Sequence, residues 1–380
     1  MAARACTRKL YLLSVRSNLN CLGPERTLQE VSRRLFASLA AKWKVGKKDV
    51  LKIGRITDKE SKEMFPLGLP HSFTKQIEVT KKADWLIRKQ TNIICDSLDN
   101  ASTTGVKPRH LLYGHTGCGM TTVLAQVIQH CFQTGWTIIH IANVFGWTHS
   151  QFETRPSPED RDVIDQPAEA TAWLNRLSVV NQHTIKQLKV SKAHFWSNQA
   201  QSSAGDNLVK VIELGLVRPR FSTDVIPVVL EEILKAENKL KVLVAIDGFN
   251  GLFNPTSIRN SEGNWVEPDQ LSLVRIVKQL VTSELPTAVV GALSTRGMKR
   301  APIRINAPPE VLLEEKGVEM MKDYDWMEVL PLSRQEFNQC VDLYVKNGWI
   351  TKKIDFKIQE QLWYLTCGVP LELSKIMRYI

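Results

Sequence analysis

The sequence predicts an α/β fold built on a wound parallel sheet, because buried-strand patterns alternate with helical patterns along the chain. Four short apolar runs rich in β-branched residues have the character of strands covered on both faces, at 110–113, 137–141, 242–246 and 288–293. Helical patterns separate them, at 121–132, 168–177, 225–239 and 269–284. This alternation is typical of a parallel sheet with helices packed against it.

The segments on either side of this core have helical patterns of their own. Apolar positions at helical spacing predict a lead-in helix ahead of the first strand: Trp85, Ile87, Ile93, Ile94 and Leu98. After the last strand, Ser333 and Glu336 have the spacing of a capping box, which predicts the start of a helix. Two further helices are predicted at 355–365 and 370–380, so a small helical lid is expected to follow the sheet.

Composition limits the class of protein. The chain has 380 residues, of which 43% are hydrophobic, and this is enough to bury a large core. No apolar run approaches the ~20 residues of a membrane-spanning helix, so no membrane span is predicted. The seven cysteines form no Cys-x-x-Cys pair, which argues against a zinc site or a disulfide framework and favours a reducing compartment.

The net charge of +11 is concentrated near the N-terminus. Residues 1–60 hold 14 Lys and Arg against 5 Asp and Glu, whereas residues 111–380 hold 28 against 29. Such a basic arm on a nearly neutral body indicates either targeting or contact with a polyanion.

The first residues have the composition of a mitochondrial transit peptide. Basic residues and hydroxyl side chains are mixed, and no acidic residue precedes Glu25. Arg34 lies where a matrix protease that cuts after Phe36 would require it. A basic amphipathic helix is the alternative. We therefore expect a transit peptide at 1–36, a basic N-terminal extension with the lead-in helix at 37–107, the α/β core at 108–330 and the helical lid at 331–380, in a protein of the mitochondrial matrix.

A glycine-rich loop joins the first predicted strand to the helix that follows, with the sequence Gly114-His115-Thr116-Gly117-Cys118-Gly119-Met120-Thr121-Thr122. Glycines at this spacing let successive backbone N–H groups and a helix N-terminus point at a phosphate. Thr121 has the position at which the loop hydroxyl normally binds Mg²⁺. A plain tight turn is the alternative. The preceding strand and the third glycine favour a phosphate-binding loop, and so a core of the P-loop NTPase type.

Met120 occupies the position of the lysine that normally neutralises the β- and γ-phosphates. Methionine fills space but has no donor. The loss of a charge-assisted contact is expected to weaken phosphate binding by about 1.5–3 kcal/mol.

Two other strand ends carry candidate site residues. Asp247 ends the apolar run 242–246 and is expected to face the metal, although an aspartate that caps the next turn is the alternative. Gly248 follows it, where many ATPases of this class have a glutamate that activates water. Ser294 follows the next strand and is a candidate γ-phosphate sensor or a simple strand-to-loop transition. Because both the lysine and the glutamate are missing, hydrolysis is not expected.

Four tryptophans lie among basic or polar neighbours, and they are candidates either for stacking on RNA bases or for ordinary packing: Trp43, Trp85, Trp147 and Trp196.

Several segments together resemble the death-associated protein family, the GTP-binding P-loop subunit of the mitochondrial small ribosomal subunit. They are 111–114, 243–248, 292–294 and, above all, the run Asp165-Gln166-Pro167-x-Glu169-Ala170-x-x-Trp173-Leu174, which no general P-loop motif requires. The resemblance extends from about residue 65 to the C-terminus.

The resemblance implies a wound sheet related to the AAA+ and STAND ATPases, with a helical lid. It also implies a bound guanine nucleotide, GTP or GDP, because the phosphate loop and Asp247 match those of the family. From the motif positions described above, we expect Mg²⁺ at Thr121 and Asp247, and the nucleotide also at Ser294. The implied partners are small-subunit rRNA and neighbouring mitoribosomal proteins, with the protein a monomer within the ribosome. Met120 departs from the lysine usual in the family.

Three functions follow as hypotheses. The first is a structural constituent of the mitochondrial small ribosomal subunit with a nucleotide pocket that does not hydrolyse. The second is a nucleotide-dependent GTPase or ATPase switch, and the third is a pro-apoptotic signalling adaptor.

Overall fold

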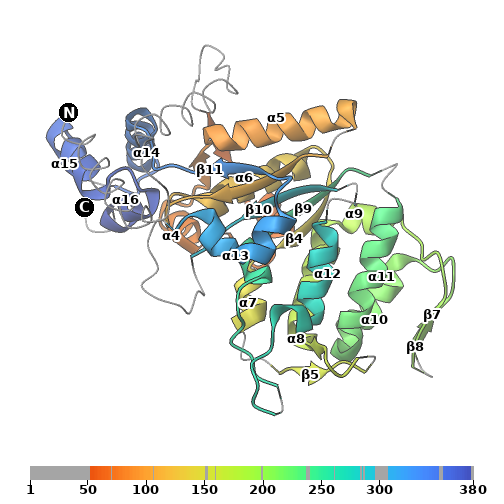
Figure 1. Ribbon diagram of the computed structural model, residues 1–380. Helices are drawn as coiled ribbons and strands as arrows, with labels where there is room; N and C mark the ends of the chain where they lie inside the picture. Colours follow the sequence, from red (N-terminus) through yellow and green to blue (C-terminus); the bar gives the residue numbers. More distant parts are fainter. Residues whose placement is uncertain are drawn as a thin grey trace. The chain divides into compact units, whose positions relative to one another are not determined.

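The structure is a five-stranded sheet in which all neighbouring strands are parallel, flanked by helices on both faces (Figure 1). The strands are ordered β11 (Asp325–Glu328), β3 (Arg109–Tyr113), β10 (Ala288–Ala292), β9 (Val242–Asp247) and β4 (Thr137–Ile141). Four of them confirm the predicted strands. The computed structural model describes residues 52–69, 71–105, 107–149, 153–158, 160–197, 200–236, 240–260, 262–282, 285, 287–295, 307–350 and 354–377.

Successive strand residues face two separate cores, because side chains alternate across a sheet. Leu111 and Val244 belong to one apolar cluster, whereas Leu112, Leu243 and Ala245 belong to the other. All five are fully buried. The central strands are therefore continuous apolar runs, as expected for a sheet covered on both sides.

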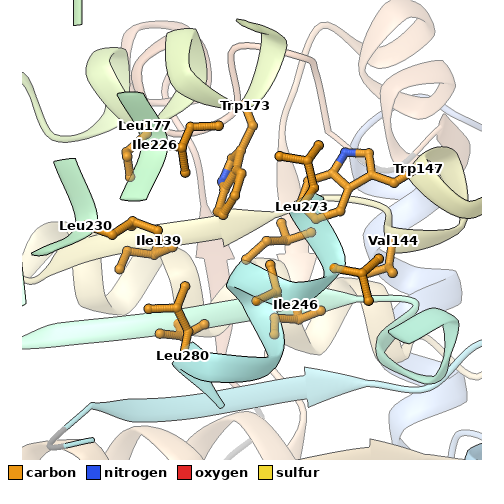
Figure 2. Packing of buried hydrophobic residues seen from close by; sticks show 14 of the residues in the cluster. Ile139, Val144, Trp147, Trp173, Leu177, Ile226, Leu230, Ile246, Leu273 and Leu280 are labelled. Carbon is orange, nitrogen blue, oxygen red and sulfur yellow. The ribbon is translucent and has the colours of Figure 1, made fainter. Parts of the chain in front are cut away.

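One face of the sheet is covered by α5 (Lys89–Thr104) and α6 (Met120–Gln133). The other is covered by α8 (Pro167–Val180), α10 (Leu208–Val217), α11 (Ser222–Lys235) and α12 (Ser272–Leu280). Figure 2 shows Trp173 of α8 pointing toward the sheet in this second core. Its ring centroid lies 5.2 Å from that of Trp147, in α7 (Val144–His149).

Two helices in the structure contain fewer residues than the sequence predicts. The predicted helix at 225–239 ends at Lys235, with Ala236 as its C-cap. The predicted helix at 269–284 is α12, preceded by the separate 3-10 turn η4 (Pro268–Gln270). The capping box of Glu267 with Gln270 holds that turn apart from the helix.

The lead-in helix begins later than the sequence pattern indicates. Trp85 lies in β2 (Asp84–Leu86), which pairs with β1 (Ile53–Arg55), and the helix α5 starts only at Lys89. The strand is preceded by α3 (Asp58–Met64) and α4 (His71–Thr80), and Trp85 stacks on Phe73 of α4 with ring centroids 5.0 Å apart. The prediction that Trp85 and Ile87 belong to the helix is therefore wrong, because Trp85 is fixed by tertiary stacking.

Three C-terminal helices follow the sheet: α14 (Arg334–Lys346), α15 (Phe356–Thr366) and α16 (Pro370–Ile376). The predicted capping box is confirmed, since the Ser333 hydroxyl accepts from the Glu336 N–H and the Glu336 carboxylate accepts from the Ser333 N–H. The helices α14, α15 and α16 share a third apolar cluster that includes Phe337, Leu362 and Leu373.

Short elements complete the described chain. They are β5 (Arg155–Pro156), β6 (Ile164–Asp165), α9 (Gln182–Ile185), β7 (His194–Ser197), β8 (Ala200–Ser202), η2 (Pro219–Phe221), η3 (Phe249–Leu252) and α13 (Pro309–Met320). No helix among the described residues is both long and apolar enough to cross a bilayer. The predicted transit peptide and Trp43 lie outside the described residues, and the domain boundaries stay predictions.

Candidate functional site

The candidate site lies at the carboxyl edge of three adjacent strands. β3 leads into the glycine-rich loop, β10 leads to Ser294, and β9 ends in Asp247. Because β10 pairs with both β3 and β9 in parallel register, all three strand ends reach the same edge of the sheet. In open α/β sheets, ligands bind at this edge.

The loop backbone requires glycine at three positions. Gly114 has φ 152°, and a Cβ there would lie 2.5 Å from the Val329 carbonyl oxygen. Gly117 has φ 90°, and Gly119, with φ 98°, is the N-cap of α6. These are left-handed or otherwise strained conformations for which residues with side chains pay an energetic cost. The sequence pattern of the loop is thus explained by its geometry.

Hydrogen bonds hold the middle of the loop. The Cys118 N–H donates to the His115 carbonyl at 3.1 Å, and His115 Nδ1 lies 2.6 Å from the Thr116 carbonyl oxygen. The hydroxyls of Thr116 and Thr295 are 2.7 Å apart and tie the loop to the end of β10. Cys118 is fully buried, and burial raises the pKa of its thiol to about 11, so the thiol stays protonated.

Met120 is the first residue of α6, and its partly buried side chain packs against the core on that face of the sheet. Thr121 is exposed and Thr122 is half-buried. The position of the usual lysine is therefore used for packing, while both threonines keep access to solvent.

The end of β9 disfavours a residue with a side chain directly after the aspartate. Asp247 is half-buried, and Gly248 has φ 71°. A Cβ at Gly248 would lie 3.0 Å from Cδ2 of Phe145. The glutamate that many ATPases carry at this position would be strained here.

Ser294 is positioned by a residue that sequence reasoning missed. Asn250 is fully buried; its Oδ1 accepts from the Ser294 N–H and its Nδ2 donates to the Ser294 carbonyl, both at 2.9 Å. This two-point contact fixes the backbone where β10 ends. A lone asparagine in an apolar stretch gave no signal in the sequence.

The glycine-rich loop offers a phosphate group backbone N–H donors more than side-chain donors. Gly119 supplies no side-chain cap to α6, so the N–H groups of the first turn have no such acceptor. A helix N-terminus of this kind attracts anions. Among the described residues no group of three His, Cys, Asp or Glu could hold a metal ion. Thr121 and Asp247 would have to bind Mg²⁺ together with the phosphates.

Arg88 is a second residue that the sequence did not reveal. It is buried at the start of α5 and donates to three different segments. Its Nε lies 3.1 Å from Glu336 Oε1, its Nη1 3.2 Å from the Cys118 carbonyl, and its Nη2 2.9 Å from the Leu330 carbonyl. One guanidinium therefore connects the glycine-rich loop with α14.

The C-terminal helices also contact the loop directly. The Leu371 N–H donates to the Gly117 carbonyl at 3.2 Å. A Cβ at Gly117 would lie 2.8 Å from the Leu371 Cβ. The start of α16 thus packs closely against the loop.

The run from Asp165 to Leu174 has a structural explanation. Asp165 is buried, accepts from the Ser272 hydroxyl and lies 3.5 Å from Arg155 Nη2. The Gln166 side chain donates to the Trp147 carbonyl at 2.6 Å, and Trp173 is 1% exposed. This segment organises the core around α8.

A wound parallel sheet with a glycine-rich strand-to-helix loop at its carboxyl edge is consistent with a P-loop-like α/β protein. Residues 85–376 match the family model described as mitochondrial ribosomal death-associated protein 3. The chain belongs to this family, which confirms the resemblance and supports the predicted mitochondrial localisation.

Curated relatives match along most of the chain. The small ribosomal subunit protein mS29 of Bos taurus is 28% identical over 367 residues, which cover 95% of this chain and 91% of the bovine protein. The mS29 protein of Mus musculus is 29% identical over 321 residues, covering 83% and 82%. That of Schizosaccharomyces pombe is 20% identical over 310 residues, covering 78% and 64%.

Proposed function

We propose that this protein is a structural constituent of the mitochondrial small ribosomal subunit. The observation that carries the proposal is the match to small ribosomal subunit proteins of two mammals over more than four fifths of both chains. Its partners are small-subunit rRNA and neighbouring mitoribosomal proteins, and it acts as a monomer within the ribosome. The concentration of basic residues in the N-terminal third supports contact with a polyanion.

In the same proposal, the core is a P-loop NTPase fold of the AAA+/STAND type and α14, α15 and α16 form its lid. The contact of Leu371 with Gly117 supports this, because it seats the last helix on the loop. Arg88 supports it as well, through its bonds to the Cys118 carbonyl and to Glu336.

The pocket would take GTP or GDP with Mg²⁺ and would not hydrolyse it. Backbone N–H groups of Gly117 and of Gly119 to Thr122 would hold the phosphates, whereas the Cys118 N–H is used within the loop. Thr121 and Asp247 would hold the metal. When bound, Mg²⁺ would neutralise phosphate charge. Met120 provides no cation, and a water-activating glutamate at position 248 would adopt a strained backbone conformation. Both observations argue against the switch hypothesis, and no structural observation favours the adaptor hypothesis.

Sedimentation tests the ribosomal role. Tagged full-length protein in mitochondrial extract is expected to run with the small subunit on a density gradient. Chelation of Mg²⁺, which separates the subunits, should leave it with small-subunit rRNA. Sedimentation near the top of the gradient while small subunits remain intact would contradict the proposal.

The Met120→Lys variant tests the pocket. Its Kd for guanine nucleotide is expected to be about 10- to 100-fold lower than that of the natural protein. The reason is that a lysine restores a charge-assisted phosphate contact worth about 1.5–3 kcal/mol. The measurement is the nucleotide that co-purifies, followed by a Kd from titration. Met320→Lys is the matched control, since Met320 is 39% exposed and lies on α13. Equal nucleotide retention by the natural protein and Met120→Lys would show that Met120 does not weaken the pocket.

A further inference from the structure

The ribbon formed by β7 and β8 carries an exposed aromatic side chain away from the candidate phosphate site. Phe195 is 68% exposed, and its backbone pairs with that of Gln201 across the ribbon. The two strands form a sheet of their own, separate from the five-stranded sheet (Figure 1).

The neighbours of Phe195 in β7 face the opposite way and anchor the ribbon. Trp196 packs against the core on the α8 side, and His194 stacks on Trp196 with ring centroids 5.7 Å apart and planes 19° apart. The Ser191 N–H and hydroxyl both contact Glu232 Oε1 of α11, at 3.1 and 2.6 Å. These contacts hold β7 in place with the Phe195 ring facing solvent. Less conformational entropy is therefore lost when a partner binds to the ring.

The stretch of sequence that contains this ribbon has no acidic residue, although Glu231 and Glu232 of α11 contact Lys192 and Ser191. Between Glu169 and Asp206 the sequence contains four Lys or Arg and neither Asp nor Glu. Lys186 and Lys189 are exposed, and no ion pair of either is found among the described residues. By contrast, Lys192 is paired with Glu231 at 2.9 Å.

The two lysines precede the aromatic ring in the chain: Lys186 is the C-cap of α9, and Lys189 lies between that helix and β7. The backbone of Lys189 forms an isolated antiparallel β-bridge with that of Asn207, and the backbone of His194 pairs with that of Ser202 in the ribbon. Lys189 and Phe195 are six positions apart, a span of at most ~20 Å at ~3.3 Å per residue. A short extended polymer can therefore contact both.

We infer that Lys186, Lys189 and Phe195, here named the ribbon surface, bind RNA at an unpaired segment whose bases are unstacked. The lysines contact phosphates and Phe195 stacks on a base, the combination by which proteins hold single-stranded nucleic acid. Charge favours RNA over a protein partner, because lysine is depleted in protein–protein interfaces. The inference rests on the proposed ribosomal function and adds a contact outside the basic N-terminal third.

Binding of the full-length protein to a fluorescent single-stranded oligoribonucleotide of mixed sequence tests the ring. Phe195→Ala is expected to weaken binding at least about fivefold, as measured by anisotropy, because base stacking on an aromatic ring is lost. Phe356→Ala is the matched control, since Phe356 is 75% exposed on α15. Equal weakening by the two variants, or none by Phe195→Ala, would overturn the inference.

The salt dependence of binding tests the lysines. The double variant Lys186→Gln/Lys189→Gln is expected to reduce the slope of log affinity against log salt by about 1.4, since each phosphate contact to a single strand contributes about 0.7. Lys316→Gln/Lys357→Gln removes two exposed lysines elsewhere and should leave the slope unchanged. A slope that both variants lower equally would contradict a specific ribbon surface.

Ultraviolet crosslinking of purified mitochondrial small subunits separates this inference from the proposed function. The peptide that contains Phe195 is expected to carry a nucleotide adduct. If the protein sediments with the subunit but this peptide is linked only to protein, the ribbon inference is wrong and the ribosomal role stands. If the protein does not sediment with the subunit, the ribosomal role fails, and the oligoribonucleotide measurements alone decide the ribbon surface.

Discussion

Replacing Trp173 with alanine is expected to lower the free energy of unfolding by about 3–5 kcal/mol, the usual cost of deleting a buried tryptophan. Trp173 is 1% exposed, projects from α8 into the core and packs on Trp147 (Figure 2). The loss combines transfer of the side chain to water with a cavity that the neighbouring helices can fill only in part. Such a loss is a large part of the 5–15 kcal/mol that stabilises a typical domain.

Urea unfolding followed by circular dichroism measures this effect. The matched control is Trp265→Ala, because Trp265 is 54% exposed and its ring contacts the Arg259 guanidinium at 4.2 Å. That variant is expected to lose less than about 1.5 kcal/mol. Similar losses for the two variants would show that the Trp173 site collapses around the cavity, contrary to the expectation.

Replacing Arg88 with leucine is expected to cost about 3–5 kcal/mol, because it leaves the buried Glu336 carboxylate without its cation. The side chains of Arg88 and Glu336 are only 8% and 12% exposed. The variant also removes the donors to the carbonyls of Cys118 and Leu330. We expect the C-terminal helices to loosen first, with increased amide hydrogen exchange in α14 and in the glycine-rich loop.

Two further variants decide whether the buried charge is the cause. Arg334→Leu breaks the exposed pair of Arg334 with Glu360 and is expected to cost no more than about 1 kcal/mol. Adding Glu336→Gln to Arg88→Leu should recover part of the loss, since glutamine keeps the capping box with Ser333 without a buried charge. If the double variant is no more stable than Arg88→Leu alone, the lost hydrogen bonds, not the charge, dominate.

The parts of the fold predicted from the sequence are those set by local pattern. The four apolar strands and the helix after the glycine-rich loop were found because alternation and helical periodicity are properties of the sequence itself. The capping box at Ser333 and Glu336 was found for the same reason.

Elements that depend on distant contacts were missed. The edge strand β11 is only four residues long, carries charges at both ends and is recognisable only through its pairing with β3. Arg88 and Asn250 act through carbonyls and amides far away in the sequence, which no local pattern records. Of the tryptophans considered for stacking, Trp85 and Trp147 are buried, and the exposed ring on the β7–β8 ribbon is the neighbouring Phe195.

The predicted site residues Gly114, Gly117, Cys118, Gly119, Met120, Thr121, Thr122, Asp247 and Ser294 follow or end three adjacent strands. The strand order could not be predicted, because it depends on how the chain crosses between non-consecutive strands. Which of these residues contact a nucleotide stays a prediction.

The contact between Gly117 and Leu371 has a consequence for synthesis of the chain. The two residues are more than 250 positions apart, and contacts between such distant positions form slowly because a long segment must first be ordered. During translation the glycine-rich loop is made in the first third of the chain, yet it acquires its neighbour only after α16 has left the ribosome that makes it. A protein whose loop is covered is therefore one whose translation has already passed through α16.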